Sequence, residues 1–152
     1  MSAHAAGEFV RWKKPEISVD ESLAEELGRR FEIDLCEGLL RAAPGNLLAL
    51  MVVGHLYTHC GRHRDALRID RRLAELRPVD PIVRYNLACS YSHLDRLDDA
   101  FAALDTAIEL GYRDFDFLEQ DPDLENLRRD PRFEPFLDER RERRANDPGE
   151  GE

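Results

Sequence analysis

The stretch that decides the fold is Leu47–Asp80, LLALMVVGHLYTHCGRHRDALRIDRRLAELRPVD, together with the stretch that follows it directly, Pro81–Asp114, PIVRYNLACSYSHLDRLDDAFAALDTAIELGYRD. The two stretches have equal length, 34 residues, and align without a gap. Eight aligned pairs are identical, against roughly two expected from average composition. The identical pairs are Tyr57/Tyr91, His59/His93, Arg62/Arg96, Asp65/Asp99, Ala66/Ala100, Glu75/Glu109, Leu76/Leu110 and Asp80/Asp114. The chain therefore contains an internal repeat, which indicates stacked units of one supersecondary structure.

Each unit predicts two helices joined by a tight turn. In the first unit an apolar pattern of helical spacing runs from Leu50 to Tyr57, and Gly61 then interrupts it. Asp95 occupies the position of Gly61 in the second unit. Both residue types tolerate the left-handed backbone that a short helix–helix turn often needs. Second helices are expected over 65–76 and 99–110, so that the fold class is all-α.

The repeat resembles the tetratricopeptide repeat family in the spacing of Gly54, Tyr57, Gly61, Ala66 and Pro78. The resemblance implies a short right-handed α-solenoid of helical hairpins, in which the first helix of each unit lines a concave groove. It also implies a protein-binding role, although modules of this fold serve many unrelated partners. The match is imperfect, because Leu50 and Arg84 stand where a Trp is common and Asp70 stands where a large apolar residue is usual.

The segments on either side of the repeats extend this architecture. Residues 31–43 are expected to form the second helix of a degenerate half repeat, because Pro44 lies one period before Pro78. Ser18 and Glu21 form a capping-box pattern for an earlier helical stretch. Residues 18–43 form one helix or two, depending on whether Gly28 breaks the pattern, and both alternatives stay open.

Downstream, Asp121-Pro122 and Asp130-Pro131 predict two helix starts, since Asp caps free N–H groups and Pro suits the first helical position. This part resembles the closing segment of many bacterial tetratricopeptide proteins, which covers the last apolar face of the stack. The expected organisation is a loose tail over 1–17, a repeat domain over 18–144 and a disordered tail over 145–152. Within the domain, the repeats span 47–80 and 81–114, and the helical cap spans 115–144.

Composition and charge restrict the kinds of partner that we expect the protein to bind. The chain carries 22 basic and 32 acidic residues, a net charge of -10, which disfavours nucleic acid and anionic membrane surfaces. Residues 1–14 lack the apolar core of a secretory signal, and no apolar run is long enough to span a bilayer. Three cysteines with no paired spacing predict reduced thiols in a cytoplasmic protein.

The partner site predicted by position in the family is the groove-facing side of the two first helices. The side chains that would contact a peptide or helix of another protein there are Met51, His55, His59, Tyr85, Asn86, Cys89 and His93. Apolar surface with uncharged polar tips suits a bound peptide. The expected function is a non-catalytic interaction module, such as an adaptor or assembly factor. The sequence names neither the partner nor the pathway.

Two other roles are weighed against this one. His55 and His59 are four residues apart, as are Cys89 and His93, so that the four could supply the nitrogen and sulfur ligands of a zinc site in a sensor or weak hydrolase. Cys60 and His63 lie in the inter-helix turn and are given no role. Alternatively, the groove could pack against a second copy of the chain in a homo-oligomer. No phosphate-binding, hydrolase or metalloprotease motif is found, so neither an enzyme nor a cofactor is expected.

Overall fold

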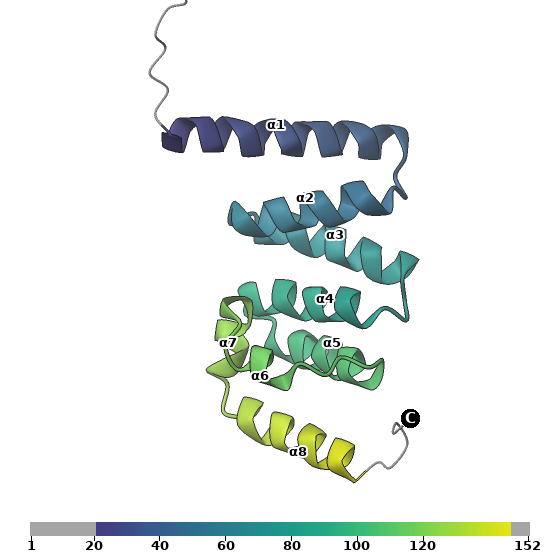
Figure 1. The fold of residues 1–152 in the computed structure, drawn as a ribbon, viewed down its shortest axis with the longest axis vertical. Helices are drawn as coiled ribbons and strands as arrows, with labels where there is room; N and C mark the ends of the chain where they lie inside the picture. The colour runs from purple at the N-terminus through teal and green to yellow at the C-terminus, as the bar shows by residue number, and fades with distance from the viewer. Residues whose placement is uncertain (1–20, 147–152) are drawn as a thin grey trace, which may run out of the picture.

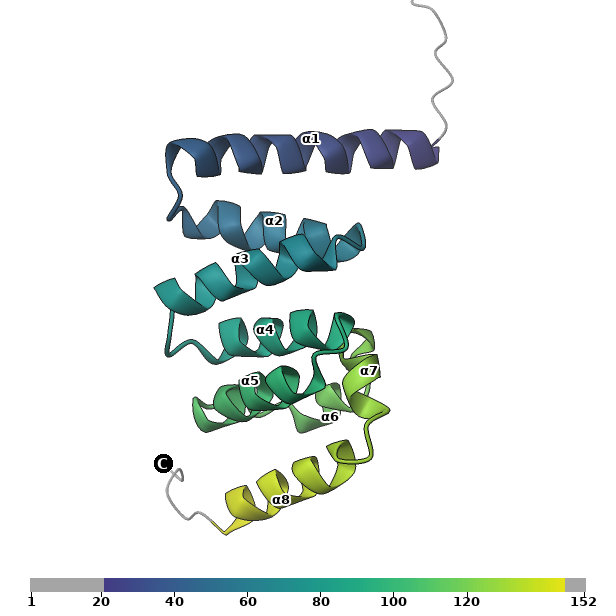
Figure 2. The same cartoon turned by 180° about the vertical axis from the view of Figure 1, so that it is seen from behind.

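The protein is described by a computed structural model over residues 21–146, in which the chain forms a stack of helices (Figures 1 and 2). The helices are α1 (Glu21–Ala42), α2 (Leu47–His59), α3 (His63–Leu76), α4 (Pro81–His93), α5 (Leu97–Glu109), α6 (Phe115–Leu118), the 3₁₀ helix η1 (Pro122–Leu124), α7 (Glu125–Arg128) and α8 (Phe133–Ala145). No strand occurs in this range. The predicted all-α solenoid of hairpins is confirmed. Helices α3 and α5 begin two residues earlier than expected.

The turns inside the two hairpins have the left-handed backbone that the sequence predicts. Gly61 has φ = 69° and Asp95, at the equivalent position, has φ = 55°. In both turns the backbone N–H of the next residue closes the loop: Arg62 donates to the Tyr57 carbonyl at 2.8 Å, and Arg96 donates to the Tyr91 carbonyl at 3.0 Å. Asp is one of the few side chains that tolerate this conformation, which explains why it can replace Gly here.

Side-chain caps fix where the first helices of the units begin. The Asn46 side chain accepts a hydrogen bond from the Ala49 N–H at 3.0 Å, at the start of α2. Asp80 does the same at the start of α4, where it accepts from the Ile82 and Val83 N–H groups. Such caps satisfy backbone donors that a helix leaves free at its N-terminus. They set the register in which α2 and α4 present their side chains to the groove.

Helix α1 is one continuous helix, and Gly28 lies inside it. This decides between the two alternatives left open for residues 18–43. A side chain added at Gly28 would meet no atom within 4 Å, so the glycine is not required there by a close contact. The capping-box residue Ser18, the expected tail 1–17 and the end of the tail expected over 145–152 lie outside the residues that the structure describes.

The hydrophobic core is divided into two clusters. The smaller one joins α1 to the first hairpin through Ile33, Cys36, Val53, Leu56, Tyr57 and Ala66. The larger one runs from α2 through α3, α4 and α5 into the C-terminal helices. Gly54 lies where α2 crosses α3, and a Cβ added to it would lie 3.1 Å from Cγ2 of Ile69. The small residue expected at this position is therefore needed for the close approach of the paired helices.

The C-terminal helices close the last hairpin. Leu118, Leu124 and Leu127 are completely buried, and Phe133 and Leu137 are nearly so. Ser92, at the end of α4, ties this cap to the stack: its carbonyl accepts from the Asn126 amide at 3.0 Å, and its hydroxyl accepts from the Leu127 N–H at 3.3 Å. In the described part of the chain, no helix has both the length and the apolar character needed to cross a membrane.

Candidate functional site

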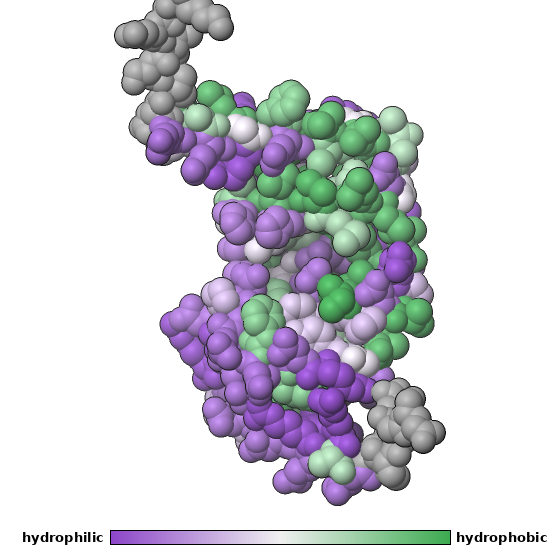
Figure 3. Space-filling model, in the orientation of Figure 1, coloured by the Kyte–Doolittle hydropathy of each residue, from purple (hydrophilic) through white to green (hydrophobic). Residues whose placement is uncertain are grey.

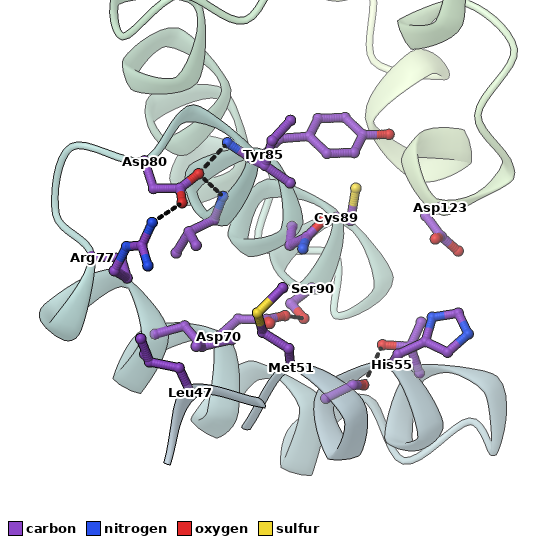
Figure 4. A pocket seen from close by; sticks show the side chains of 16 residues that line it. Leu47, Met51, His55, Asp70, Arg77, Asp80, Tyr85, Cys89, Ser90 and Asp123 are labelled. Carbon is purple, nitrogen blue, oxygen red and sulfur yellow. Dashed lines mark hydrogen bonds and ion pairs between the residues drawn. The ribbon is translucent and has the colours of Figure 1, made fainter. Parts of the chain in front are cut away.

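A cavity of about 440 Å³ lies between α2, α3 and α4, and we call it the groove. Met51 and His55 line it from α2, Asp70 from α3, and Ile82, Asn86 and Ser90 from α4. Figure 4 shows Asp70, Ser90 and Met51 in its middle. Arg77 and Asp80 stand at one end, and His55 and Asp123 stand at the other.

Five of the seven residues predicted as the contact set line the groove: Met51, His55, Tyr85, Asn86 and Cys89. Met51, His55 and Asn86 are exposed, so a bound segment could touch them. His59 is exposed but does not line the groove, and its ring lies 5.0 Å from that of His55. His93 lies outside the lining as well and is half-buried against the cap.

Tyr85 and Cys89 contribute to the wall of the groove from inside the core. The Tyr85 ring stacks on Tyr112 with ring centroids 4.7 Å apart, and only 8% of the residue is exposed. The Cys89 thiol lies 3.9 Å from a carboxylate oxygen of Asp121, and burial raises its pKa. A thiol in this state is a poor nucleophile and a poor metal ligand. Both residues therefore form part of the groove wall, and little of either side chain is accessible to a molecule in the groove.

The most unusual group in the groove is the carboxyl of Asp70. The residue is 7% exposed, and the Ser90 hydroxyl donates a hydrogen bond to its Oδ2 at 2.5 Å. Burial raises the pKa of Asp70 from 3.8 to about 6, against the opposing effect of that hydrogen bond. No Lys, Arg or His pairs with it among residues 21–146. A buried carboxylate without a cation is costly, and here it faces a cavity.

The other two carboxyls at the groove already have partners. Asp80 caps α4 and lies 3.3 Å from the Arg77 guanidinium. Asp123 lies 3.0 Å from Nε2 of His93, and this hydrogen bond is the main cause that holds its pKa below the usual value. In the described part of the chain, Asp70 thus differs from both, because its hydrogen-bond partner is the neutral Ser90 hydroxyl.

Two histidines stack at the cap end of the groove in a structural contact. The ring of His93 stacks on that of His63 with centroids 4.2 Å apart, while its Nε2 faces Asp123. Burial and the neighbouring His93 lower the pKa of His63. This stack joins α3, α4 and η1, so that His93 holds the cap in place. We predicted no role for His63, because the sequence does not show which side chains pack against a residue that lies next to a turn.

The zinc alternative finds no support in this geometry. In the part of the chain that the structure describes, no three His, Cys, Asp or Glu side chains converge as ligands of one ion would. His55 and His59 lie beside each other, whereas His93 faces Asp123 and Cys89 faces Asp121. The two i,i+4 pairs lie on α2 and α4, and they do not point to a common centre.

Sequence reasoning missed six polar residues that line the groove: Thr58, Asp70, Arg77, Asp80, Ser90 and Asp123. One signal was available for Asp70, since it departs from the large apolar residue usual at its position. Ser90 carried no such signal, because its role follows from a contact 20 residues away in sequence.

Comparisons with known proteins agree with the fold. No protein-family model matches the chain. A chloroplastic protein of Arabidopsis thaliana is 33% identical over 87 residues, which cover 55% of this chain and 26% of that protein. The chain thus spans about a quarter of the length of this relative. The solved structure MamA MSR-1 C2 superposes with a TM-score of 0.57 at 24% identity, over 80% of this chain and 72% of that one. At this identity the likeness identifies the fold alone, a tetratricopeptide-type α-solenoid.

Proposed function

We propose that this protein is an interaction module that binds a segment of a partner protein in the groove between α2, α3 and α4. The observation that carries the proposal is the buried carboxyl of Asp70, which faces an open cavity and has no cationic partner among residues 21–146. The segment it fits carries a basic side chain, Lys or Arg, next to apolar ones. The tetratricopeptide-type fold supports a protein-interaction role in general, and the features of the groove support the finer proposal.

Apolar surface at the mouth of the groove gives a partner segment something to bury. Met51 is 57% exposed and Ile82 is 53% exposed, and they approach the cavity from α2 and α4. Asn86, which also lines the cavity, offers an amide that can both donate and accept hydrogen bonds. Apolar walls with a few polar groups are typical of sites that hold peptides.

A basic side chain in the groove would complete the environment of Asp70. An ammonium or guanidinium group within about 4 Å of the carboxylate restores the charge partner that burial requires. Among residues 21–146 the Ser90 hydroxyl is the side-chain donor to this carboxyl, at Oδ2, and Oδ1 lies beside Gly54. Asp80 and Asp123 compete less well for such a cation, because Arg77 and His93 already neighbour them.

Binding to peptide arrays tests the proposal. Short peptides that combine apolar residues with one Lys or Arg should bind better than the same peptides with Gln or Glu at that position. Asp70→Asn keeps the shape of the side chain and removes the charge, so it should abolish the preference for a basic residue. Asp116→Asn is the matched control, since it removes the same charge from a side chain that is 91% exposed and lies outside the groove.

Two results would contradict the proposal. If Asp70→Asn and Asp116→Asn lowered binding equally, the effect would come from the net charge of the protein and not from the groove. If Met51→Ala and Asn86→Ala left peptide binding unchanged, the segment would bind elsewhere on the surface.

A further inference from the structure

Helix α1 has apolar side chains on two opposite faces. The inner face, with Ile33, Cys36 and Leu40, packs on α2. The outer face presents large apolar side chains at every fourth position, each 46–69% exposed. These residues, which we call the outer stripe, are Leu23, Leu27, Phe31, Leu35 and Leu39. A helix that is apolar on both sides is typical of one buried between two neighbours, whereas among residues 21–146 α1 packs on the first hairpin alone.

The exposed apolar surface of the molecule is concentrated at this end. Eight of the eleven exposed large apolar residues in the described range belong to α1 and α2. In Figure 3 the hydrophobic colour gathers over these two helices, and the opposite end is mostly hydrophilic. At roughly 100 Å² exposed for each side chain, the outer stripe offers roughly 500 Å², a size that marks an interaction surface.

Comparison with the two complete repeats shows which side chains of α1 lack the cover that a first helix gives. One period after Leu35 and Leu39 come Ile69 and Leu73 on α3, and two periods after them come Ala103 and Ala107 on α5. In the complete hairpins these positions are covered: Leu73 and Ala107 are buried, and Ile69 lies against Gly54 of the first helix. Leu35 and Leu39 are 53% and 46% exposed because α1 has no first helix beside it.

We propose that residues 8–17 of the chain fold back along the outer stripe and take the place of that missing first helix. One period before α2 lie residues 13–25, of which 21–25 belong to α1, so the part of this stretch left to lie beside α1 is the part before Glu21. It also reaches. From Phe9 to Glu21 the chain can extend about 40 Å at about 3.3 Å per residue, and α1 is about 33 Å long.

The composition of this segment fits the surface of α1. Phe9, Val10 and Trp12 supply apolar area, and Arg11, Lys13 and Lys14 alternate with them. Residues 8–17 hold three basic and two acidic residues, a net charge of +1. Helix α1 holds six acidic residues and three arginines, a charge of -3. Apolar and ionic contacts would therefore favour the same pairing, and the covalent link gives the segment a high effective concentration.

A second copy of the chain fits the outer stripe less well. A dimer would place two copies of α1, each with a net charge of -3, against each other. The like charges of the two helices, and of two chains at -10 each, oppose that pair.

Intrinsic fluorescence tests the proposal directly, because Trp12 is the only tryptophan of the chain. In the full-length protein its emission should be blue-shifted and resistant to acrylamide quenching, relative to a free peptide of residues 6–17. Both values should be independent of protein concentration, since the contact is within one chain.

Substitutions on both sides of the contact should release Trp12. Leu35→Asp combined with Leu39→Asp should shift its emission to that of the free peptide, while circular dichroism stays helical. Lys13→Glu combined with Lys14→Glu changes only residues outside the described helices and should shift the emission in the same direction. Val79→Asp, at a residue that is 75% exposed in the loop before α4, is the matched control and should change nothing.

Three outcomes would overturn the proposal. Trp12 in the wild-type chain could show the emission and quenching of the free peptide in a monomer, which would leave the outer stripe for another protein. A dimeric mass with a solvent-exposed Trp12 would assign the stripe to a second copy. A blue shift that both double variants leave intact would place Trp12 on a different surface.

Discussion

Replacing Asp70 by Asn should stabilise the protein, and the gain should depend on pH. The folded state binds a proton at Asp70 more tightly than the unfolded state does, because burial raises the pKa of the carboxyl from 3.8 to about 6. Stability that depends on this proton is fully present below about pH 4 and is lost as the pH rises through about 6. Asn cannot ionise, so the variant avoids this loss.

The magnitude follows from the size of the shift. A difference of about two pKa units, at 1.36 kcal/mol each, corresponds to about 3 kcal/mol of free energy of unfolding. The Ser90 hydroxyl can still donate to the amide oxygen of the new Asn, as it does to Oδ2 of Asp70. Asp70→Asn should therefore match the wild type near pH 4 and exceed it by up to about 3 kcal/mol at pH 7.5.

Urea unfolding at a series of pH values, followed by circular dichroism, measures this difference. The free energy of unfolding of the Asp116→Asn control should depend on pH as that of the wild type does, since the Asp116 side chain is 91% exposed. The reasoning is refuted if Asp70→Asn is less stable than the wild type at pH 7.5 with no change in pH dependence. That result would mean that the ionised carboxyl stabilises the empty protein and needs no cation from a partner.

Further predictions concern packing, the cap and metal. Gly54→Leu should lower the free energy of unfolding by about 1–3 kcal/mol, measured by urea unfolding, because α2 and α3 cannot separate without loss of contacts. Tyr85→Ala should cost about 3 kcal/mol in the same assay, since the ring is buried against Tyr112; an unchanged stability would show that the stack contributes nothing. Truncation before Asp121 should abolish cooperative unfolding and cause aggregation by light scattering, whereas removal of residues 147–152 should have little effect. A chelator should leave the melting temperature of untagged protein unchanged, and a drop would reopen the zinc alternative.

The fold could be predicted from the sequence because the repeat constrains chemistry at fixed positions. The left-handed turns require Gly or a residue such as Asp, and the helix crossing requires a small residue at Gly54. These requirements are local, so a single sequence displays them. The continuity of α1 through Gly28 could not be decided in this way, because nothing packs closely on that position and glycine is permitted there without being required.

The site was only partly predictable, since its shape depends on contacts between distant segments. Position on a helix indicated that Tyr85 faces the groove side, but not that Tyr112 stacks on it. Similarly, the position of His93 indicated the groove, but the residue lies outside the groove lining and Nε2 of its ring faces Asp123 of the cap. The sequence marks Asp70 as a polar residue at an apolar position, whereas its lack of a cationic partner among residues 21–146 becomes visible only in three dimensions.

The two hydrogen bonds from the cap to Ser92 have a consequence for how the stack comes apart. They join the last hairpin to the cap that covers its outer face. The larger hydrophobic cluster also continues through this hairpin into α8. At the other end, α1 is held to the first hairpin by the smaller cluster. In a one-dimensional array each unit is secured by its neighbours alone, so fraying should start at α1 and travel toward α5. Amide hydrogen exchange would then show protection that increases along the chain from α1 toward the C-terminal cap.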